Sequence, residues 1–385
     1  MQIPSSYSDR ARAAFQALQT GKPAEAKALF DAEVDAGTTD VTLLMGLAMA
    51  HRDMNEPDLA IGVLDRLLAV EPRHFLGLMM RADAALAAGR KREAASYYNA
   101  AVSVAPPAER QAPHVRGHVE RARQVASGLV SDYESYLRDT LVAQGFDVAA
   151  EAPGHASQAV DILFGRRQIY VQQPEQFFYP GLPQRQFYER AEFEWAAALE
   201  AETGAIAEEA RAVLALDDAF QPYQHANVTG PRTRHSKLYN SPDWSAAYLI
   251  HSGEVNDAVA QHCPTAMGAL EQVPLCDVPG KNPTVLFSLL RPGTHIEPHH
   301  GLVNTRLIVH LPLIVPAGCT LRVGNERREW REGELMIFDD SIEHEAHNPT
   351  DALRVVLLFD IWRPELTDRD RQFVRATFQA IEAYQ

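Results

Sequence analysis

Two histidines and an arginine in the C-terminal part of the chain have the types and the order of a metal site with an anion clamp. His299 follows Pro298, His344 lies in a polar segment after an apolar run, and Arg354 comes ten residues after His344. Imidazole nitrogens suit ferrous iron, and a guanidinium binds a carboxylate through two parallel hydrogen bonds. The set therefore predicts an iron oxygenase that anchors a dicarboxylate cosubstrate. A zinc enzyme stays open as an alternative, because two imidazoles do not choose between metals.

The surroundings of Arg354 strengthen this prediction. Alternate side chains of an extended segment share a face, so Arg354 lies beside Val356 and Leu358. A charged group among apolar neighbours is costly unless it meets an anion. Arg306 and His310 share a face of the apolar run 305–314 in the same way. We therefore expect a polar surface inside an apolar sheet.

The segments that must position these side chains have a period of two from Pro283 onward. Gly, Pro, Asn or Asp turns separate short β-rich runs, and no helical crossovers lie between them, which disfavours a parallel α/β sheet. The pattern predicts a double-stranded β-helix, a jelly roll of the cupin type, with core strands at about 283–362 and flanking helices. The expected strands are 284–290, 305–314, 320–323, 327–330, 334–338 and 354–361.

The N-terminal third repeats itself with a period of 34 residues, as the spacing of Gly21, Asn55 and Gly89 shows. An alanine follows each of these by five residues, and a large apolar residue follows each by nine. These are Ala26, Ala60 and Ala94, and Phe30, Leu64 and Tyr98. The period resembles the tetratricopeptide repeat, a helical hairpin that needs stacked neighbours to bury its apolar face. We expect three units over about 8–107, serving as a docking or dimerising module and not in the chemistry.

Between the repeats and the β-rich segments the pattern changes. Residues 109–142 have helical periodicity without the repeat signature and are expected to cap the solenoid. Residues 159–164 and 168–172 are expected to be short strands around a Gly-Arg-Arg turn. The predicted division is an all-α repeat domain with its capping helix at 1–125 and a β domain at 126–385.

Composition narrows the classes of partner. The 385 residues include 36 basic and 51 acidic residues, a net charge of −15, which argues against nucleic acid or an anionic membrane as the main partner. The N-terminal residues have no apolar core of a signal peptide, and no long apolar run predicts a membrane span, so we expect a cytoplasmic protein. The three cysteines are odd in number and widely spaced, which disfavours a disulfide framework and a zinc-binding CxxC pattern.

Several motifs in the C-terminal half carry a family resemblance. They are PGTHIEPH at 292–299, NTRL at 304–307, HLPL at 310–313, FDDSIEHE at 338–345 and DIWRPEL at 360–366. Together they resemble the aspartyl/asparaginyl β-hydroxylases, a branch of the Fe(II)- and 2-oxoglutarate-dependent oxygenases. Helical repeats in front of the catalytic domain are similar to the domain plan of this family.

The resemblance implies a role for each matching residue. His299 and His344 would bind iron, Ser288 and Arg354 would hold the distal carboxylate of 2-oxoglutarate, His310 would contact the cosubstrate, and Arg306 would face the substrate. The reaction it implies is hydroxylation of the β-carbon of an aspartyl or asparaginyl residue in a peptide or protein, recruited partly by the repeats, with release of succinate and CO2.

Two positions near these residues set this chain apart. The usual third metal ligand of such oxygenases is a carboxylate two residues after the first histidine, and Gly301 stands there, as the resemblance to this family implies. Relatives that act on protein domains have a second arginine where this chain has Ile308. The metal and cosubstrate assignments do not depend on that position, but the substrate assignment does. Two alternatives therefore stay open: the same chemistry on a free amino acid or other small molecule, and a catalytically silent repeat scaffold.

Neighbouring polar residues are weaker candidates. Asp339 and Asp340 fit a turn or a supporting contact better than direct metal binding, and Glu343 and Glu345 flank His344 closely enough to orient its imidazole.

Overall fold

The computed structural model describes residues 7–35, 39–107, 113–150, 154–224 and 237–384. Contacts along the chain divide it into two units, Met1–Arg166 and Arg167–Gln385. The boundary expected at 125/126 falls inside one continuous helix, α7 (Pro113–Ala143), so the division lies further along the chain. Among the described residues, every helix is too short or too polar to span a bilayer.

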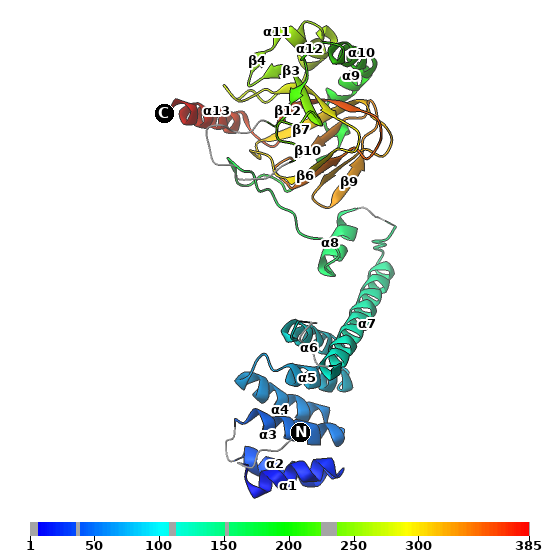
Figure 1. Ribbon diagram of the computed structural model, residues 1–385, viewed down its shortest axis with the longest axis vertical. Helices are drawn as coiled ribbons and strands as arrows, with labels where there is room; N and C mark the ends of the chain where they lie inside the picture. The colour runs from blue at the N-terminus through cyan, green and yellow to red at the C-terminus, as the bar shows by residue number, and fades with distance from the viewer. Residues whose placement is uncertain (1–6, 36–38, 108–112, 151–153, 225–236, 385) are drawn as a thin grey trace. The chain divides into compact units, whose positions relative to one another are not determined.

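Three helical hairpins form the first part of the N-terminal unit (Figure 1). Their helices are α1 (Asp9–Gln19), α2 (Pro23–Val34), α3 (Val41–Asp53), α4 (Pro57–Val70), α5 (Phe75–Ala87) and α6 (Lys91–Val104). Gly21, Asn55 and Gly89 lie in the turns of the three hairpins with φ of 70°, 58° and 76°. This left-handed region favours glycine and, among other residues, asparagine. The 34-residue spacing therefore reflects one turn geometry used three times.

The repeated alanines and large residues fill the core of these hairpins. Ala26, Ala60 and Ala94 are buried, as are Phe30, Leu64 and Tyr98. Small alanines at these positions let paired helices approach closely, so the predicted helical repeats are confirmed. Helix α7 continues this core, because its Ala122 and Ala126 pack with residues of α5 and α6.

One part of the N-terminal unit differs from expectation. Residues 159–164 were expected to be a strand but lie mainly in α8 (His155–Leu163), and residues 168–172 form no strand. Val160 and Ile162 gave the run its β character, yet Val160 is buried on one face of the helix. The ring of Phe164, just after the helix, packs against Tyr133 of α7 with 5.6 Å between centroids. Tertiary contacts of α8 thus outweigh its local β propensity.

The C-terminal unit is built from two antiparallel sheets. The 8-stranded sheet has the order β1-β10-β7-β12-β5-β3-β2, with β4 paired to β3, and the 4-stranded sheet has the order β6-β11-β8-β9. The first eight of these strands by position are β1 (Phe187–Tyr188), β2 (Gln221–Pro222), β3 (Trp244–His251), β4 (Glu254–Val255), β5 (Val285–Leu290), β6 (His295–His299), β7 (Arg306–Ile314) and β8 (Thr320–Val323). The others are β9 (Glu326–Glu329), β10 (Met336–Phe338), β11 (His344–His347) and β12 (Arg354–Trp362). The predicted absence of a parallel α/β sheet is confirmed for these strands.

Apolar side chains between the two sheets form one core. Leu290, Ile308 and Phe338 of the larger sheet pack in one cluster with Ile296 and Leu321 of the smaller sheet. Since residues 306, 308 and 310 alternate with the fully buried residues 307, 309 and 311 along β7, the first set faces the smaller sheet and the second faces away from it.

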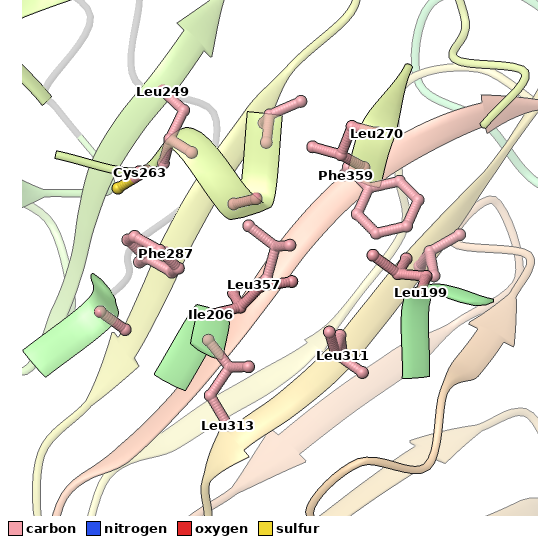
Figure 2. Packing of buried hydrophobic residues seen from close by; sticks show 14 of the residues in the cluster. Leu199, Ile206, Leu249, Cys263, Leu270, Phe287, Leu311, Leu313, Leu357 and Phe359 are labelled. Carbon is pink, nitrogen blue, oxygen red and sulfur yellow. The ribbon is translucent and has the colours of Figure 1, made fainter. Parts of the chain in front are cut away.

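Helices cover the other face of the larger sheet, as Figure 2 shows. Leu199 of α9 (Ala196–Ala201), Ile206 of α10 (Thr203–Leu214) and Leu270 of α12 (Pro264–Leu270) pack on Phe287, Leu311 and Leu357 of the central strands. The short helix α11 (Asp257–Ala260) adds Val259 to this cluster, and η2 (Arg190–Glu192) precedes α9 in the chain. Helix α13 (Asp368–Ala383) buries Val374 and Phe378 in a separate cluster. The larger sheet is therefore held between a helical layer and the smaller sheet.

Candidate metal and anion site

The two predicted histidines are direct partners across a pair of neighbouring strands. His299 ends β6, His344 begins β11, and the antiparallel register places them opposite each other. Their ring centroids are 4.1 Å apart, with an angle of 49° between the planes. The structure thus brings together two imidazoles that are 45 residues apart in the chain.

Backbone carbonyls fix the tautomer of both rings. Nδ1 of His299 lies 2.8 Å from the carbonyl oxygen of Glu297, and Nδ1 of His344 lies 3.0 Å from that of Ile342. A carbonyl only accepts, so each Nδ1 donates its hydrogen and the Nε2 lone pair is left as the ligand atom. Burial and the neighbouring His299 lower the pKa of His344 well below its usual range, which keeps this ring neutral. Neutral imidazoles with defined Nε2 lone pairs are the state that binds a metal ion.

The glutamates beside His344 do not orient it. Oε1 of Glu343 accepts from Arg322 at 2.8 Å, and Oε1 of Glu345 accepts from the same guanidinium at 2.7 Å. The carbonyl oxygen of Ile342 orients the ring instead, so the expectation that these two glutamates orient His344 is wrong.

Gly301 occupies the position where a third ligand is usual in such oxygenases, and a side chain there would require the side chain of Asp340 to move. A Cβ added to Gly301 would lie 2.1 Å from Oδ2 of Asp340, a distance that real contacts do not reach. Within the described part of the chain, no third His, Cys, Asp or Glu joins the histidine pair as a metal-binding group. The donor set is therefore two imidazoles, which leaves room for ligands that are not protein side chains.

Arg354, the first residue of β12, is a buried cation without an acidic partner among the described residues. Its side chain donates to the carbonyl oxygen and Oγ of Ser288 at 3.1 and 3.3 Å, and its guanidinium carbon lies 4.7 Å from the centre of the Trp330 ring. Its Nε has no hydrogen-bond partner, and burial lowers the pKa of Arg354 to about 9. A bound anion would supply both the missing acceptor and the missing charge.

His310 lies beside this guanidinium and is also incompletely bonded. Its Nδ1 is buried without a partner, and burial together with Arg354 lowers the pKa of His310 well below its usual range. A buried polar group without a partner costs about 1–3 kcal/mol. The Nε of Arg354 and the Nδ1 of His310 both lack a partner among the described residues, which indicates a ligand that bonds to both.

One cavity of about 400 Å³ unites the predicted residues. Side chains of both sheets line it, and apolar groups such as Ile296, Leu321 and Phe338 form much of its wall. The predicted residues on its wall are Ser288, His299, Arg306, His310, His344 and Arg354. Metal-binding and anion-binding groups therefore face one space.

Comparison with known proteins agrees with this geometry. The family model described as aspartyl/asparaginyl beta-hydroxylase matches residues 200–364, and a tetratricopeptide repeat model matches residues 45–112. Residues 200–364 are therefore similar to the aspartyl/asparaginyl β-hydroxylase domain, and this part of the chain is called the hydroxylase domain below. Both resemblances drawn from the sequence motifs are thus confirmed.

Three relatives illustrate the range of proteins that contain such a hydroxylase domain. The mouse aspartyl/asparaginyl beta-hydroxylase is 38% identical over 141 residues, which are 36% of this chain and 19% of that protein. An ornithine lipid ester-linked acyl 2-hydroxylase of Rhizobium tropici is 34% identical over 180 residues, or 46% of this chain and 60% of that protein. Human aspartate beta-hydroxylase domain-containing protein 2 is 32% identical over 206 residues, or 52% and 54%. The chain spans less than two thirds of each relative's length.

Arg306 lines the cavity of the hydroxylase domain, but it is already paired. It donates to Oδ2 of Asp360 at 2.6 Å and to Oδ2 of Asp340 at 3.4 Å. It also borders a second cavity of about 290 Å³, which shares Ile308 and Leu358 with the first. The sequence placed Arg306 correctly on the inner face of β7, but the two carboxylates that hold it were not foreseen.

Sequence reasoning also missed an aromatic wall of the hydroxylase domain. The rings of Tyr223 and Trp244 stack with 4.2 Å between centroids and 21° between planes, and both line the cavity. Trp244 begins the run WSAAYLIH, a β-rich segment that becomes β3 and pairs with β5 beside Ser288, whereas Tyr223 directly follows the short strand β2.

Proposed function

We propose that the hydroxylase domain is an Fe(II)- and 2-oxoglutarate-dependent dioxygenase that hydroxylates the β-carbon of aspartyl or asparaginyl residues in a peptide or protein. The observation that carries the proposal is the buried guanidinium of Arg354, which has no acidic partner among the described residues and lines the same cavity as the histidine pair. A cavity built only for a metal has no need of such a cation.

The residues present fit the two groups that this reaction requires. His299 and His344 would hold iron through Nε2, because both Nδ1 atoms donate to backbone carbonyls. Two neutral imidazoles would leave the full charge of a ferrous ion, and the keto-acid end of the cosubstrate would supply negative charge to it, while the distal carboxylate would meet Arg354. Since Gly301 closes the position of a third protein ligand, the metal would keep positions for the cosubstrate and for oxygen.

When bound, iron and 2-oxoglutarate supply the oxidising chemistry, in which oxygen converts the keto acid to succinate and CO2 and one oxygen atom enters the substrate. The protein's share is orientation. Arg354 and the Oγ of Ser288 would bind the distal carboxylate, and the Nδ1 of His310, which has no partner among the described residues, would form a hydrogen bond to the cosubstrate. Apolar walls such as Phe338 and Leu321 exclude water around the reacting groups.

The strand order supports a double-stranded β-helix of the cupin type. Strands β5, β7, β10 and β12 lie in the larger sheet, whereas β6, β8, β9 and β11 lie in the smaller one. A chain that alternates between two facing sheets brings the last residue of β6 and the first residues of β11 and β12 to one cavity.

We further infer that the protein acts in the cytoplasm. We also infer that the tetratricopeptide repeats dock the peptide or protein substrate, since this repeat buries its own core and leaves a surface for partners.

The test is mass spectrometry of candidate peptides after incubation with Fe(II), 2-oxoglutarate and oxygen. The expected product is heavier by one oxygen atom and is absent with His299→Ala. His347→Ala is the matched control, because His347 faces His295 on the same two strands but does not line the cavity. Without oxygen, the loaded protein should show a metal-to-ligand charge-transfer absorbance. Its absence would favour a catalytically silent scaffold, and full activity of His299→Ala would remove this residue from the metal site.

A second candidate is the same chemistry on a free amino acid or another small molecule. The Rhizobium tropici relative favours it, since it is named as an acyl 2-hydroxylase of a lipid and this chain spans 60% of its length. The apolar residues Ile308 and Leu358 between the two cavities are compatible with such a ligand. Succinate formation that depends on a free amino acid or lipid, and not on peptides, would select this candidate.

A further inference from the structure

Of the two permanent cations among the described residues that line the cavity, Arg306 is ion-paired, and Arg354 is assigned to the cosubstrate by the proposed function. Among the described lining residues, Arg306 and Arg354 are the two with a permanent positive charge. Arg354 belongs to the cosubstrate subsite beside Ser288. Among these described residues, a carboxylate on the substrate would therefore meet a cation only at Arg306, while the lining also carries the acidic residues Glu175 and Glu297.

The charge of Arg306 is matched by two carboxylates, and its buried Nε, which has no hydrogen-bond partner among the described residues, can donate to a carbonyl oxygen of the substrate. Its two terminal nitrogens donate to Asp360 and Asp340, whose side chains are only 1% and 8% exposed. Asp360 is held firmly, because it also accepts from the backbone N–H of Thr284 at 3.0 Å and from the side chain of Asn282. Burial raises the pKa of Asp340 to about 6, so at pH 8 this carboxyl is ionised and one guanidinium between two buried carboxylates leaves a net negative charge. A third carboxylate brought to this place would meet repulsion in a medium that screens it poorly.

Asp340 offers the substrate a different kind of contact. Its Oδ1 is buried, lies on a residue that lines the cavity, and has no hydrogen-bond partner among the described residues. An ionised carboxylate only accepts hydrogen bonds. The group that satisfies this oxygen must donate, as the NH2 of an amide does and as a substrate carboxylate cannot.

Ile308 supplies no charge toward a substrate carboxylate. It lies between Arg306 and His310 on the inner face of β7 and borders both cavities. Its side chain is apolar, so the strand that carries Arg306 supplies no second cation toward the substrate. The charge balance around the substrate is therefore set by Arg306 and its two aspartates.

We propose that the hydroxylase domain selects an uncharged, amide-bearing side chain, asparaginyl over aspartyl, with Oδ1 of Asp340 accepting a hydrogen bond from the substrate amide. Asp340 and Ile308 are thereby residues that determine specificity. This inference rests on the proposed function, because it names the substrate class of the same site.

The test compares two peptides that differ only in Asn or Asp at the target residue, at pH 8. The wild-type kcat/KM should be at least about tenfold higher for the Asn peptide, the discrimination that one unmatched buried polar group readily produces. Binding of the two peptides to the loaded protein without oxygen should show the same order by calorimetry. Equal use of both peptides, or preference for Asp, overturns this inference and leaves the proposed function intact. No hydroxylation of either peptide overturns both.

Three variants separate the causes. Asp340→Asn removes one negative charge and replaces an acceptor by a donor. The ratio of kcat/KM for the Asn peptide to kcat/KM for the Asp peptide should therefore fall by about tenfold or more, because kcat/KM for the Asp peptide rises. Ile308→Arg adds a cation and should lower the ratio in the same direction, whereas the uncharged Ile308→Met should keep the preference for Asn. Charge-transfer absorbance with 2-oxoglutarate verifies that each variant is folded and loaded. An unchanged ratio in loaded Asp340→Asn contradicts the role given to this residue.

Discussion

The side chain of Asp340 occupies the space in which a Cβ on Gly301 would lie, at the edge of the cavity that His299 and His344 line. A Cβ on Gly301 would lie 2.1 Å from Oδ2 and 2.3 Å from Cγ of Asp340, while the backbone N–H of Gly301 donates to the carbonyl oxygen of Asp340 at 2.6 Å. The backbone bond fixes the approach, and the aspartate side chain fills the place of a side chain on the glycine. Asp340 would therefore have to move before residue 301 could carry a side chain.

This relationship predicts the effect of adding one methyl group. Gly301→Ala should destabilise the protein by about 1–3 kcal/mol, since overpacking a buried site forces neighbours to move. The double variant with Asp340→Gly should recover most of this loss, because the alanine then occupies emptied space. Urea denaturation of the single and double variants measures the coupling. Additive losses in the double variant would show that the two residues do not compete.

Arg354 leads to an unusual prediction for a buried residue. Because its charge is buried without an acidic partner among the described residues, Arg354→Met should raise the melting temperature of the metal-free and ligand-free protein. The same variant should lose the stabilisation that 2-oxoglutarate gives to the wild type with its metal. Thermal denaturation with and without the cosubstrate measures both effects.

Arg363 provides the matched control. It is equally buried, but it donates to Oδ2 of Asp339 at 2.7 Å, and both side chains are 0% exposed. Arg363→Met should therefore lower stability by about 3–5 kcal/mol, the usual cost of leaving one member of a buried pair alone. A loss of stability in Arg354→Met as large as that in Arg363→Met would refute the unpaired character of Arg354.

Glu345, on the outer surface of the smaller sheet, should make the free energy of unfolding depend on pH in the acid range. Although partial burial opposes it, hydrogen bonds from Arg322 and His295 lower the pKa of Glu345 to about 2. A carboxyl whose pKa is lower in the folded state stabilises the protein above its unfolded pKa of about 4.3, and this contribution is lost as pH falls toward 2. Glu345→Gln should therefore reduce the free energy of unfolding at pH 7 and have little effect near pH 2. Urea denaturation across this range tests the prediction, and a pH-independent difference would contradict it.

Patterns along the chain predicted the helices and strands better than they predicted the contacts between those helices and strands. The 34-residue period located the hairpins because every repeat places a turn residue and a core residue at fixed spacing. The period of two found β5, β7, β8, β9, β10 and β12 but not the strands that end or begin at the histidines. Strand β6 contains Pro298 and mostly polar residues, and β11 is the short run HEAH, so neither alternates clearly.

The charge partners of the site were beyond sequence reasoning for a different reason. Arg306 pairs with Asp340 and Asp360 through the register of β7 with β12 and the turn after β10. Such a register is decided by the packing of a whole sheet, and no local pattern contains it. Residue types and order therefore predicted which groups line the cavity, whereas their net charge required the fold.

The turn geometry of the repeats yields a prediction in which one substitution has opposite effects at two sites. Gly89 has a φ of 76°, and a Cβ there would meet nothing within 4 Å, so Gly89→Ala tests backbone conformation alone. It should cost about 1–2 kcal/mol, the penalty of a left-handed conformation for an L side chain. Gly62 lies inside α4, and a Cβ there also meets nothing within 4 Å. Gly62→Ala should therefore stabilise by about 0.5–1 kcal/mol, because alanine favours the helix interior. Thermal denaturation followed by circular dichroism at 222 nm, a wavelength at which helices dominate, compares the two, and a shift of the same sign in both would contradict the assigned turn.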